Sequence, residues 1–256
     1  MDLTEAQWKI LDPLMPKTKS GKVGRPPQDI RKVVNGILWT CRTGAPWHDL
    51  PGKYPSYQTC HRYFQKWVQS GLWNKILWRI AQDLKDRGKI DLTECFIDGT
   101  FAAAKKGALV FGKTKKGKGT KIMAIADASG LPLSIWAGAA NTHECKLVEE
   151  TLDAKHVSGR PQNLIGDMAY DSDPLDEKLK RRKIKLIAPH KRNRKKKPTQ
   201  DGRTFRRYVR RWKVERLFAW LQNYRRCGTR YDFYLENYLG FVQLACIVIL
   251  VKVILR

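Results

Sequence analysis

The chain has 256 residues, with 50 Lys and Arg against 24 Asp and Glu, and a formal net charge of +26. Hydrophobic residues make up 42% of it, which supports a packed core and argues against a disordered chain. A charge of this size repels itself unless a polyanion is bound, so nucleic acid is the expected partner and an anionic membrane surface the alternative.

The first 90 residues predict helices. LTEAQWKILDPLMP begins with Thr4 as a helix cap, and DIRKVVNGILWTCRTG ends at Gly44. After a short turn, SYQTCHRYFQKWVQSGLW forms another helix whose first residues are polar. Helix, turn and helix in this order are typical of a helix-turn-helix DNA reader, and the alternative is a helical cap on a larger domain. In a helix-turn-helix domain, the residues that contact DNA would be Tyr57, Gln58, Thr59, Arg62 and Lys66.

From residue 91, short apolar runs typical of strands replace the helical period. ECFIDGTF and NLIGDMAY each form a strand that ends in an acid, IMAIADASGLPLSIWAGA forms a hairpin, and IKLIAP forms a further strand. The helices HECKLVEETLDAK, DPLDEKLKRRK and TFRRYVRRWKVERLFAWLQNYRR alternate with these strands. This order predicts an α/β fold with a mixed sheet flanked by helices, and domains at 1–90 and 91–256. Residues 102–121, rich in Gly and Lys, are expected to form a loop that is mobile or ordered by DNA.

The segment LGFVQLACIVILVKVIL near the C-terminus is the most apolar part of the chain. Gln243 and Lys252 interrupt it, so it predicts a buried helix and not a membrane span. The six cysteines form no CxxC pair, which leaves a zinc ribbon unsupported. The first residues, MDLTEAQWKI, are amphipathic rather than an apolar leader. We therefore expect a reduced cytosolic protein with its cysteines in the core.

Three acids define a candidate site. Asp98 and Asp167 each end an apolar strand, where open α/β sheets place their sites. On the long basic helix, Glu215 either relieves the charge of its arginine neighbours or ligates a metal. Its position at the edge of the apolar stripe favours the metal, since that stripe should face the sheet and is made of Val214, Leu217, Phe218 and Leu221. Converging carboxylates repel one another, and two Mg²⁺ ions would relieve the repulsion and support phosphoryl transfer.

Other polar residues allow two interpretations each. His143 opens a helix after the third strand, where it either lies near a scissile phosphate or caps the helix. Asp171 and Asp173 favour helix capping over metal binding. The run KRNRKKK at 191–197 favours a clamp on the DNA backbone over a solvated charge run. From Lys191 to Arg230, sixteen Lys and Arg stand against two acids, which concentrates basic charge around Glu215.

These motifs resemble the DDE transposases of bacterial insertion sequences, in the insertion-sequence-five family, over nearly the whole chain. LTEAQWKILDPLMP, GRPPQDIRKVVNGILW and CRTGAPWHDLP resemble its N-terminal region, and FIDGT, GKTKKGKGTKI, GDMAYDS and RYDFYLENYLGFVQLACI its core and tail. The family signature is Tyr, two residues, Arg, three residues, Glu, six residues and a basic residue. Tyr208, Arg211 and Glu215 match it, and Gln222 stands at the last position. The resemblance implies an RNase H-like fold for 91–256, without the large insertion domain of some related transposases.

The resemblance also implies an enzyme that binds the terminal inverted repeats of a transposon, cleaves the ends and joins the 3′-OH groups to target DNA. Asp98, Asp167 and Glu215 would be catalytic and would ligate two Mg²⁺ ions, for which Mn²⁺ can substitute. The implied partners are double-stranded DNA and at least one further copy of the chain, at the nucleoid of a bacterial cytoplasm and without a membrane. The alternatives are a metal-dependent nuclease without strand transfer and a non-catalytic DNA-binding derivative. The residues expected to contact DNA are Arg25, Tyr57, Gln58, Thr59, Arg62, Lys66, Lys115, Lys116, Lys118, Lys121, His143, Lys191, Arg192, Arg194, Tyr208, Arg211 and Arg225.

Overall fold

The computed structural model describes residues 2–17, 28–105, 108–192, 194, 197 and 204–255, without the side chains of 204–206. Its N-terminal part consists of helices. Thr4 and Gln7 form a reciprocal capping box at the first helix, and Gly44, with φ of 73°, ends the second. Both predicted caps are therefore confirmed. The elements are α1 (Glu5–Leu11), η1 (Asp12–Leu14), α2 (Ile30–Thr43), η2 (Trp47–Asp49), α3 (Tyr57–Gln69) and α4 (Leu72–Asp86).

A mixed sheet follows, as the sequence predicts. Its order is β2-β3-β1-β5-β6, with β4 paired to β3 and β7 paired to β1. The strands β1, β3 and β4 run antiparallel, whereas β5 and β6 continue the sheet in parallel from β1. The strands are β1 (Glu94–Ala104), β2 (Gly112–Thr114), β3 (Gly117–Ala126), β4 (Pro132–Ala139), β5 (Asn163–Ile165), β6 (Lys185–Ile187) and β7 (Thr229–Arg230).

The prediction of a loop over residues 102–121 is wrong for most of that segment. β1 and β3 continue their antiparallel pairing as far as Ala103 and Gly119, and the short β2 pairs back onto β3. Gly119 permits this, because a Cβ there would lie 2.1 Å from the Phe101 ring. The Lys-rich stretch is therefore part of a long β-ribbon. Lys106 and Gly107 lie outside the described residues.

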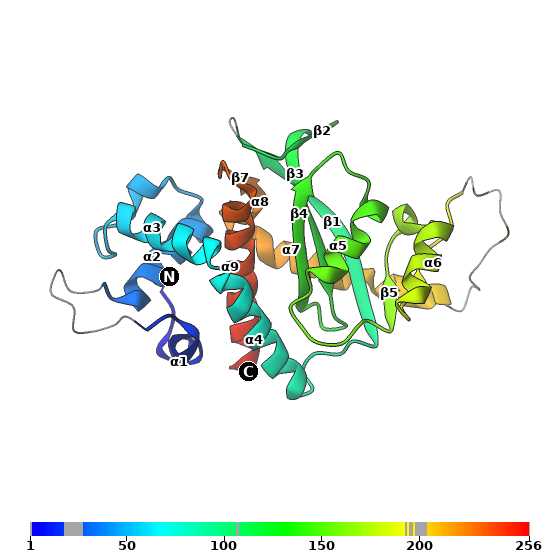
Figure 1. The fold of residues 1–256 in the computed structure, drawn as a ribbon, viewed down its shortest axis with the longest axis horizontal. Coiled ribbons are helices and arrows are strands. Elements are labelled where there is room, and N and C mark those ends of the chain that lie inside the picture. The colour runs from blue at the N-terminus through cyan, green and yellow to red at the C-terminus, as the bar shows by residue number, and fades with distance from the viewer. Residues whose placement is uncertain are drawn as a thin grey trace.

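Helices cover both faces of the sheet. In Figure 1, α5 lies in front of the sheet and α7 behind it. The basic helix predicted over 204–226 is divided, because Tyr224 leaves the helix with extended backbone and buries its ring. The helices are η3 (Glu144–Leu147), α5 (Val148–Asp153), η4 (Met168–Tyr170), α6 (Asp173–Arg181), η5 (Thr204–Arg211), α7 (Trp212–Gln222), α8 (Arg225–Gly228) and α9 (Leu235–Ile254).

The helix α9 joins the N-terminal helices to the sheet, and it stands between them in Figure 1. Phe241 of α9 stacks on Phe64 of α3 with ring centroids 4.2 Å apart. One continuous hydrophobic core thus includes residues from both expected domains. By length and composition α9 is apolar enough to cross a membrane, but 67% of its apolar window is buried inside the protein. All six cysteines are free, and five of them are buried.

Candidate active site and nucleic-acid interface

The sheet brings Asp98 and Asp167 to neighbouring positions. β1 and β5 run parallel, and their last register pair is Phe96 with Ile165. Asp98 and Asp167 each follow two residues later, so the two carboxylates lie at the same level of adjacent chains. Asp98 does not end its strand, contrary to the prediction, because β1 continues against β3. It is β5 that ends here and leaves this side of β1 open.

The backbone fixes one oxygen of each of these carboxylates. Asp98 Oδ1 accepts a hydrogen bond from the Gly99 amide at 2.8 Å, and Asp167 Oδ1 accepts one from the Ala169 amide at 2.8 Å. The Asp167 contact caps the short helix η4. In both residues the second oxygen, Oδ2, faces the guanidinium of Arg211.

Glu215 reaches the same place from α7. Its neighbours on the helix face the sheet as predicted, since Val214, Leu217, Phe218 and Leu221 are all buried and α7 packs on β1 and β3. The Glu215 side chain is 51% exposed, against 34% for Asp167 and 15% for Asp98. The site therefore runs from the edge of the core outward to solvent.

Arg211 lies among all three carboxylates. Its Nη1 is 3.1 Å from Asp98 Oδ2 and 4.0 Å from Asp167 Oδ2, and its Nη2 is 2.7 Å from Glu215 Oε1. Glu215 thus does pair with an arginine four residues earlier, but that arginine also binds the two aspartates. Within the part of the chain that the structure describes, no three His, Cys, Asp or Glu side chains form a ready metal-binding group. Here a side-chain cation offsets the carboxylate charges.

Burial makes the charge on Asp98 costly. It raises the pKa of the Asp98 carboxyl to about 6, although the Gly99 amide and Arg211 act in the opposite direction. Nearby Glu144 and Asp167 raise it further. A cation beside Asp98 would favour its ionised form. Three carboxylates of this kind are hard oxygen donors, a set that fits Mg²⁺ or Mn²⁺.

A fourth carboxylate, Glu144 of η3, stands beside the site and was not predicted. Its Oε1 lies 3.3 Å from Lys121 Nζ, and its Oε2 accepts a hydrogen bond from the Tyr170 hydroxyl at 3.0 Å. A Cβ at Gly99 would lie 2.8 Å from Glu144, so the glycine after Asp98 makes room for this side chain. No spacing in the sequence marks Glu144, because its neighbours come from β3 and η4.

The predicted reading helix presents an exposed polar face. Gln58, Arg62 and Lys66 recur every four residues and are exposed, opposite the buried Cys60, Phe64 and Trp67. Tyr57 is also exposed. Thr59 is half-buried, and its hydroxyl accepts a hydrogen bond from the Ser56 hydroxyl. This geometry is suited to a helix that approaches DNA with one side.

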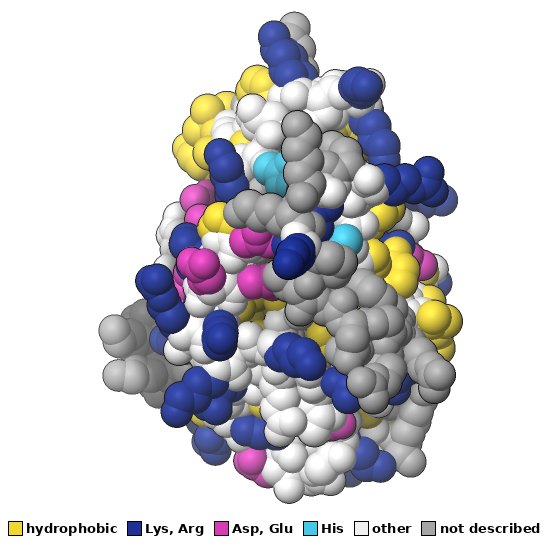
Figure 2. All heavy atoms as spheres, turned by 90° about the vertical axis from the view of Figure 1, so that its right-hand side faces the viewer, with side chains coloured by type: hydrophobic (Ala, Val, Ile, Leu, Met, Phe, Trp, Pro, Cys, Tyr) yellow, Lys and Arg dark blue, Asp and Glu magenta, His cyan; other side chains and the backbone are white. Residues whose placement is uncertain are grey.

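Most of the other predicted DNA contacts lie at the surface. The exposed ones are Lys115, Lys116, Lys118, His143, Lys191, Arg192 and Arg225, whereas Tyr208 is half-buried and lies under Arg211. His143 also caps η3, as Nδ1 accepts from the Cys145 amide. Figure 2 shows one end of the molecule, where Lys and Arg side chains surround a small group of acidic ones. Arg25 lies outside the described residues.

Besides Arg211, two of the predicted contacts bind carboxylates of the protein itself. Lys121 pairs with Glu144, and Arg194 pairs with Asp171 at 2.8 Å and Asp173 at 2.6 Å. Only 15% of the Lys121 side chain and 11% of the Arg194 side chain are exposed. The charges of Lys121 and Arg194 are therefore already offset within the protein.

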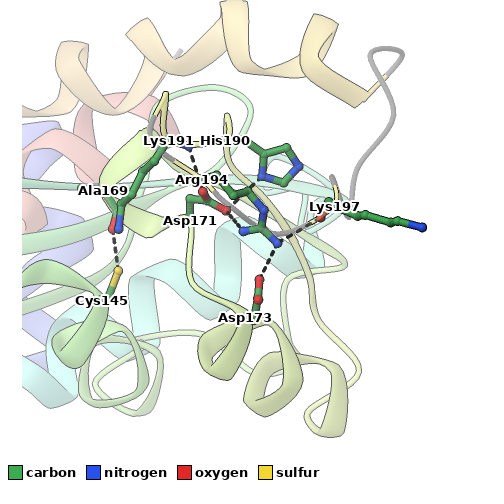
Figure 3. A network of polar contacts seen from close by, with 8 residues as sticks. All are labelled: Cys145, Ala169, Asp171, Asp173, His190, Lys191, Arg194 and Lys197. Carbon is green, nitrogen blue, oxygen red and sulfur yellow. Dashed lines mark hydrogen bonds and ion pairs between the residues drawn. The ribbon is translucent and has the colours of Figure 1, made fainter.

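Asp171 anchors the basic segment that follows β6 (Figure 3). Its carboxylate binds His190 Nδ1 at 3.0 Å, the Lys191 amide at 2.8 Å and Arg194. Burial alone would raise the pKa of Asp171, but the Lys191 and His190 contacts hold it below the usual value. Asp171 therefore does not cap α6, whose N-cap is Ser172. The predicted capping role is wrong for Asp171, because its carboxylate turns toward His190, Lys191 and Arg194.

Two family models match the sequence. The model described as "Putative transposase of IS4/5 family" matches residues 3–77, and the model described as "Transposase DDE domain" matches residues 91–250. The "Putative transposase for insertion sequence element IS6501" of Brucella ovis is 35% identical over 132 residues, which are 51% of this chain and 96% of that protein. The "Putative transposase for insertion sequence element IS402" of Burkholderia cepacia is 29% identical over 139 residues, which are 51% of this chain and 62% of that protein.

A solved structure resembles the chain over most of its length. The piggyBac transposase, in a synaptic complex with hairpin DNA, matches with a TM-score of 0.52 and 12% identity, over 94% of this chain and 69% of that chain. At this identity the likeness concerns the fold. It confirms the expected RNase H-like architecture, a mixed sheet flanked by helices with a helical region before it.

Proposed function

Because the chain belongs to the family of transposases with a DDE domain, we propose that it binds terminal inverted repeats, cleaves the transposon ends and transfers the 3′-OH groups to target DNA. The observation that carries this proposal is the convergence of Asp98, Asp167 and Glu215 on the single side chain of Arg211. The three acids come from β1, from the end of β5 and from α7, so the fold itself assembles them.

Asp98, Asp167 and Glu215 would hold two divalent ions, Mg²⁺ or Mn²⁺. Ions in such a site activate the attacking oxygen and offset the charge on the leaving oxygen of a phosphodiester. The backbone amides of Gly99 and Ala169 hold the aspartates in place. Arg211 and Tyr208 would neutralise and orient phosphates beside Glu215, since the Arg211 guanidinium lies 5.8 Å from the Tyr208 ring centre.

DNA would be read by the N-terminal helices and held by the basic surface. The exposed face of α3, with Gln58, Arg62 and Lys66, would enter the major groove, and residues 1–90 would serve as the DNA-binding part. Residues 91–256 would serve as the catalytic part. Two transposon ends must be brought together before transfer, so the active form would contain at least two copies of the chain. It would work at the nucleoid in a bacterial cytoplasm.

Two other functions are compatible with the same chain. A metal-dependent nuclease would cleave DNA without joining the ends to a target. A non-catalytic DNA-binding derivative would have the basic surface but no cleavage. The retention of all three acids favours an enzyme over the derivative.

The decisive test is Mg²⁺-dependent cleavage of a duplex that carries a transposon end, by folded Glu215→Gln protein. Cleavage should fall by several orders of magnitude, because the change keeps the shape of the side chain and removes a charge that holds the ions. Asp98→Asn and Asp167→Asn should have the same effect, and combining them should add little, since the three act as one unit. Glu177→Gln, an exposed change on α6, is the matched control.

The outcomes separate the candidate functions. Near-normal cleavage by Glu215→Gln would leave Glu215 as a charge-relieving neighbour of Arg211 and contradict the proposal. A pre-cleaved end supplied with target DNA distinguishes the enzyme activities, because a transposase joins them and a nuclease does not. A wild-type protein that binds end DNA with Mg²⁺ present and leaves it intact would be the non-catalytic derivative.

A further inference from the structure

A cluster of apolar side chains is exposed at the end of β1 that lies far from the acids. Half of the twelve large hydrophobic residues exposed in the described part of the chain belong to two short segments there, and each is 40–57% exposed. One segment precedes β2 and the other follows β7, near the top of Figure 1. The cluster, called the aromatic platform below, consists of Leu109, Val110, Phe111, Tyr231, Phe233 and Tyr234.

A buried arginine holds the two segments of the platform together. Arg230 is fully buried and donates to the carbonyl oxygens of Leu109, Val110 and Phe233, and also to the Thr120 hydroxyl. The Leu109 amide donates to the Phe233 carbonyl at 2.9 Å. The backbone of the platform therefore has a fixed conformation, because one buried guanidinium is hydrogen-bonded to both of its segments.

One of the two non-glycine residues with positive φ in the described part of the chain also lies there. Val110 has φ of 54°, in the left-handed region that a β-branched residue rarely adopts. The carbonyl contact from Arg230 holds this conformation, which turns the Val110 side chain, 57% exposed, to the surface. Strained positions of this kind persist where the surrounding structure specifies them, commonly at functional surfaces.

Lysines lie over the rings of the platform. Lys105 Nζ is 5.8 Å from the Tyr231 ring centre, and Lys118 Nζ is 5.3 Å from the Phe111 ring centre. The hairpin that continues from Phe111 adds exposed Lys113, Lys115 and Lys116. Of the nearby acids, Asp232 faces the buried Arg226 at 3.7 Å, and Glu236 is exposed. Aromatic rings stack on bases, and ammonium groups pair with phosphates. A surface that combines the two is therefore complementary to a nucleic-acid strand.

We propose that the aromatic platform binds unpaired bases of DNA. In an intact duplex the base faces are stacked on one another, so only an unstacked base has a face free to cover an aromatic ring. The platform lies roughly 20 Å along β1 from Asp98, which separates it from the acids but keeps it within reach of the same DNA. This inference rests on the proposed function, because DNA handled at transposon ends would supply the unpaired strand. A second copy of the chain, with its charge of +26, is a poorer match to a lysine-bordered surface.

The test compares two labelled DNAs with the full-length protein. One is a paired duplex, and the other is the same duplex with a single unpaired 2-aminopurine, whose fluorescence falls when it stacks on a ring. The wild-type protein should bind the second DNA about fivefold or more tightly than the first and should quench its fluorescence. Combined Phe111→Ala, Tyr231→Ala and Phe233→Ala changes should abolish the preference and the quenching, with paired-duplex affinity unchanged. The matched control is Trp78→Ala, which removes an equally exposed ring from α4.

Each outcome decides a different question. A wild-type protein that binds and cleaves paired DNA without preferring the unpaired base would overturn the platform proposal alone. A protein that binds neither DNA would overturn the proposed function as well. Should the combined variant fail to fold, the three single changes, each at a half-exposed side chain, give the same comparison. Sedimentation velocity covers the last case, because a loss of dimer without a loss of base preference would identify the platform as a contact between copies and overturn the proposal.

Discussion

Arg211 and Asp98 are joined across the candidate active site, with Nη1 3.1 Å from Oδ2, although 113 positions separate them in the sequence. The same guanidinium reaches Glu215 at 2.7 Å. A permanent positive charge therefore lies among the carboxylates that would bind metal ions. Two cations in one carboxylate group compete, since each favours the ionised acids and each repels the other. If ions bind as proposed, Arg211 would have to shift its contacts, and a DNA phosphate is the natural alternative partner.

Replacing Arg211 with Ala should tighten Mn²⁺ binding in the absence of DNA while it lowers DNA cleavage. The expected gain is about threefold to tenfold, in line with the roughly 1 kcal/mol that a partly exposed charge pair contributes. Calorimetry, or the electron paramagnetic resonance of free Mn²⁺, measures the affinity without any turnover. Arg210→Ala is the matched control, since Arg210 pairs with Glu94 at 2.8 Å. Weaker Mn²⁺ binding in Arg211→Ala would mean that Arg211 holds the acids in their places.

Much of this site follows from the sequence, because strand-ending acids and helix periodicity are local patterns. Apolar runs broken by an acid predict Asp98 and Asp167, and the place beside the apolar stripe of α7 predicts Glu215. The pattern did not reveal that β1 continues for six residues beyond Asp98. That extension depends on pairing with β3, which is a contact distant in the sequence.

Side-chain partners were less predictable for the same reason. Glu144, the buried Arg230 and the anchor at Asp171 all depend on groups from other elements. The run KRNRKKK predicts Arg194 as a DNA contact, yet two aspartates about twenty residues earlier bind it. A sequence gives the charge of a residue, whereas the fold decides whether that charge is available to a ligand.

DNA affinity should fall steeply with salt. The exposed lysines of the β2–β3 turn and the basic surface near Glu215 would each displace counterions from phosphates, at a slope near −0.9 per phosphate in log–log form. Combined Lys115→Ala and Lys116→Ala changes should reduce the magnitude of that slope by about two. The measurement is the Kd for a duplex between about 50 and 200 mM salt. An unchanged slope in the variant would place the turn away from the backbone, and Lys75→Ala on α4 controls for the loss of surface charge.

Sequence preference should depend on Arg62. This exposed residue lies at the centre of the polar face of α3, and a bidentate contact to a base discriminates by roughly 1–3 kcal/mol. Arg62→Ala should therefore lower the affinity for an inverted repeat about fivefold or more, and the affinity for a scrambled duplex much less. The full chain is required, because the N-terminal helices share a core with α9. Equal losses on both duplexes would reduce Arg62 to a phosphate contact, and Arg79→Ala on α4 is the control.

Acid sensitivity should trace in part to His156, which is buried and whose Nε2 has no hydrogen-bond partner. Burial lowers the pKa of His156 from 6.5 to about 4. Between these pH values the unfolded chain binds a proton that the folded chain does not. The contribution of His156 to the free energy of unfolding is therefore fully present above pH 6.5 and is lost as the pH falls toward 4. The loss between pH 7.5 and pH 5 should be about 2 kcal/mol.

Urea unfolding of the wild-type protein and of His156→Gln at both pH values isolates this contribution. The variant has no titrating group at position 156, so its free energy of unfolding should change by about 2 kcal/mol less over the same interval. Asp127 acts in the opposite direction, since burial raises its pKa to about 6, but it is present in both proteins and its effect cancels in the comparison. An identical pH dependence in the two proteins would contradict this prediction. It would show that the pKa of His156 is the same in the folded and the unfolded protein, and therefore that the buried ring has a charged or hydrated environment.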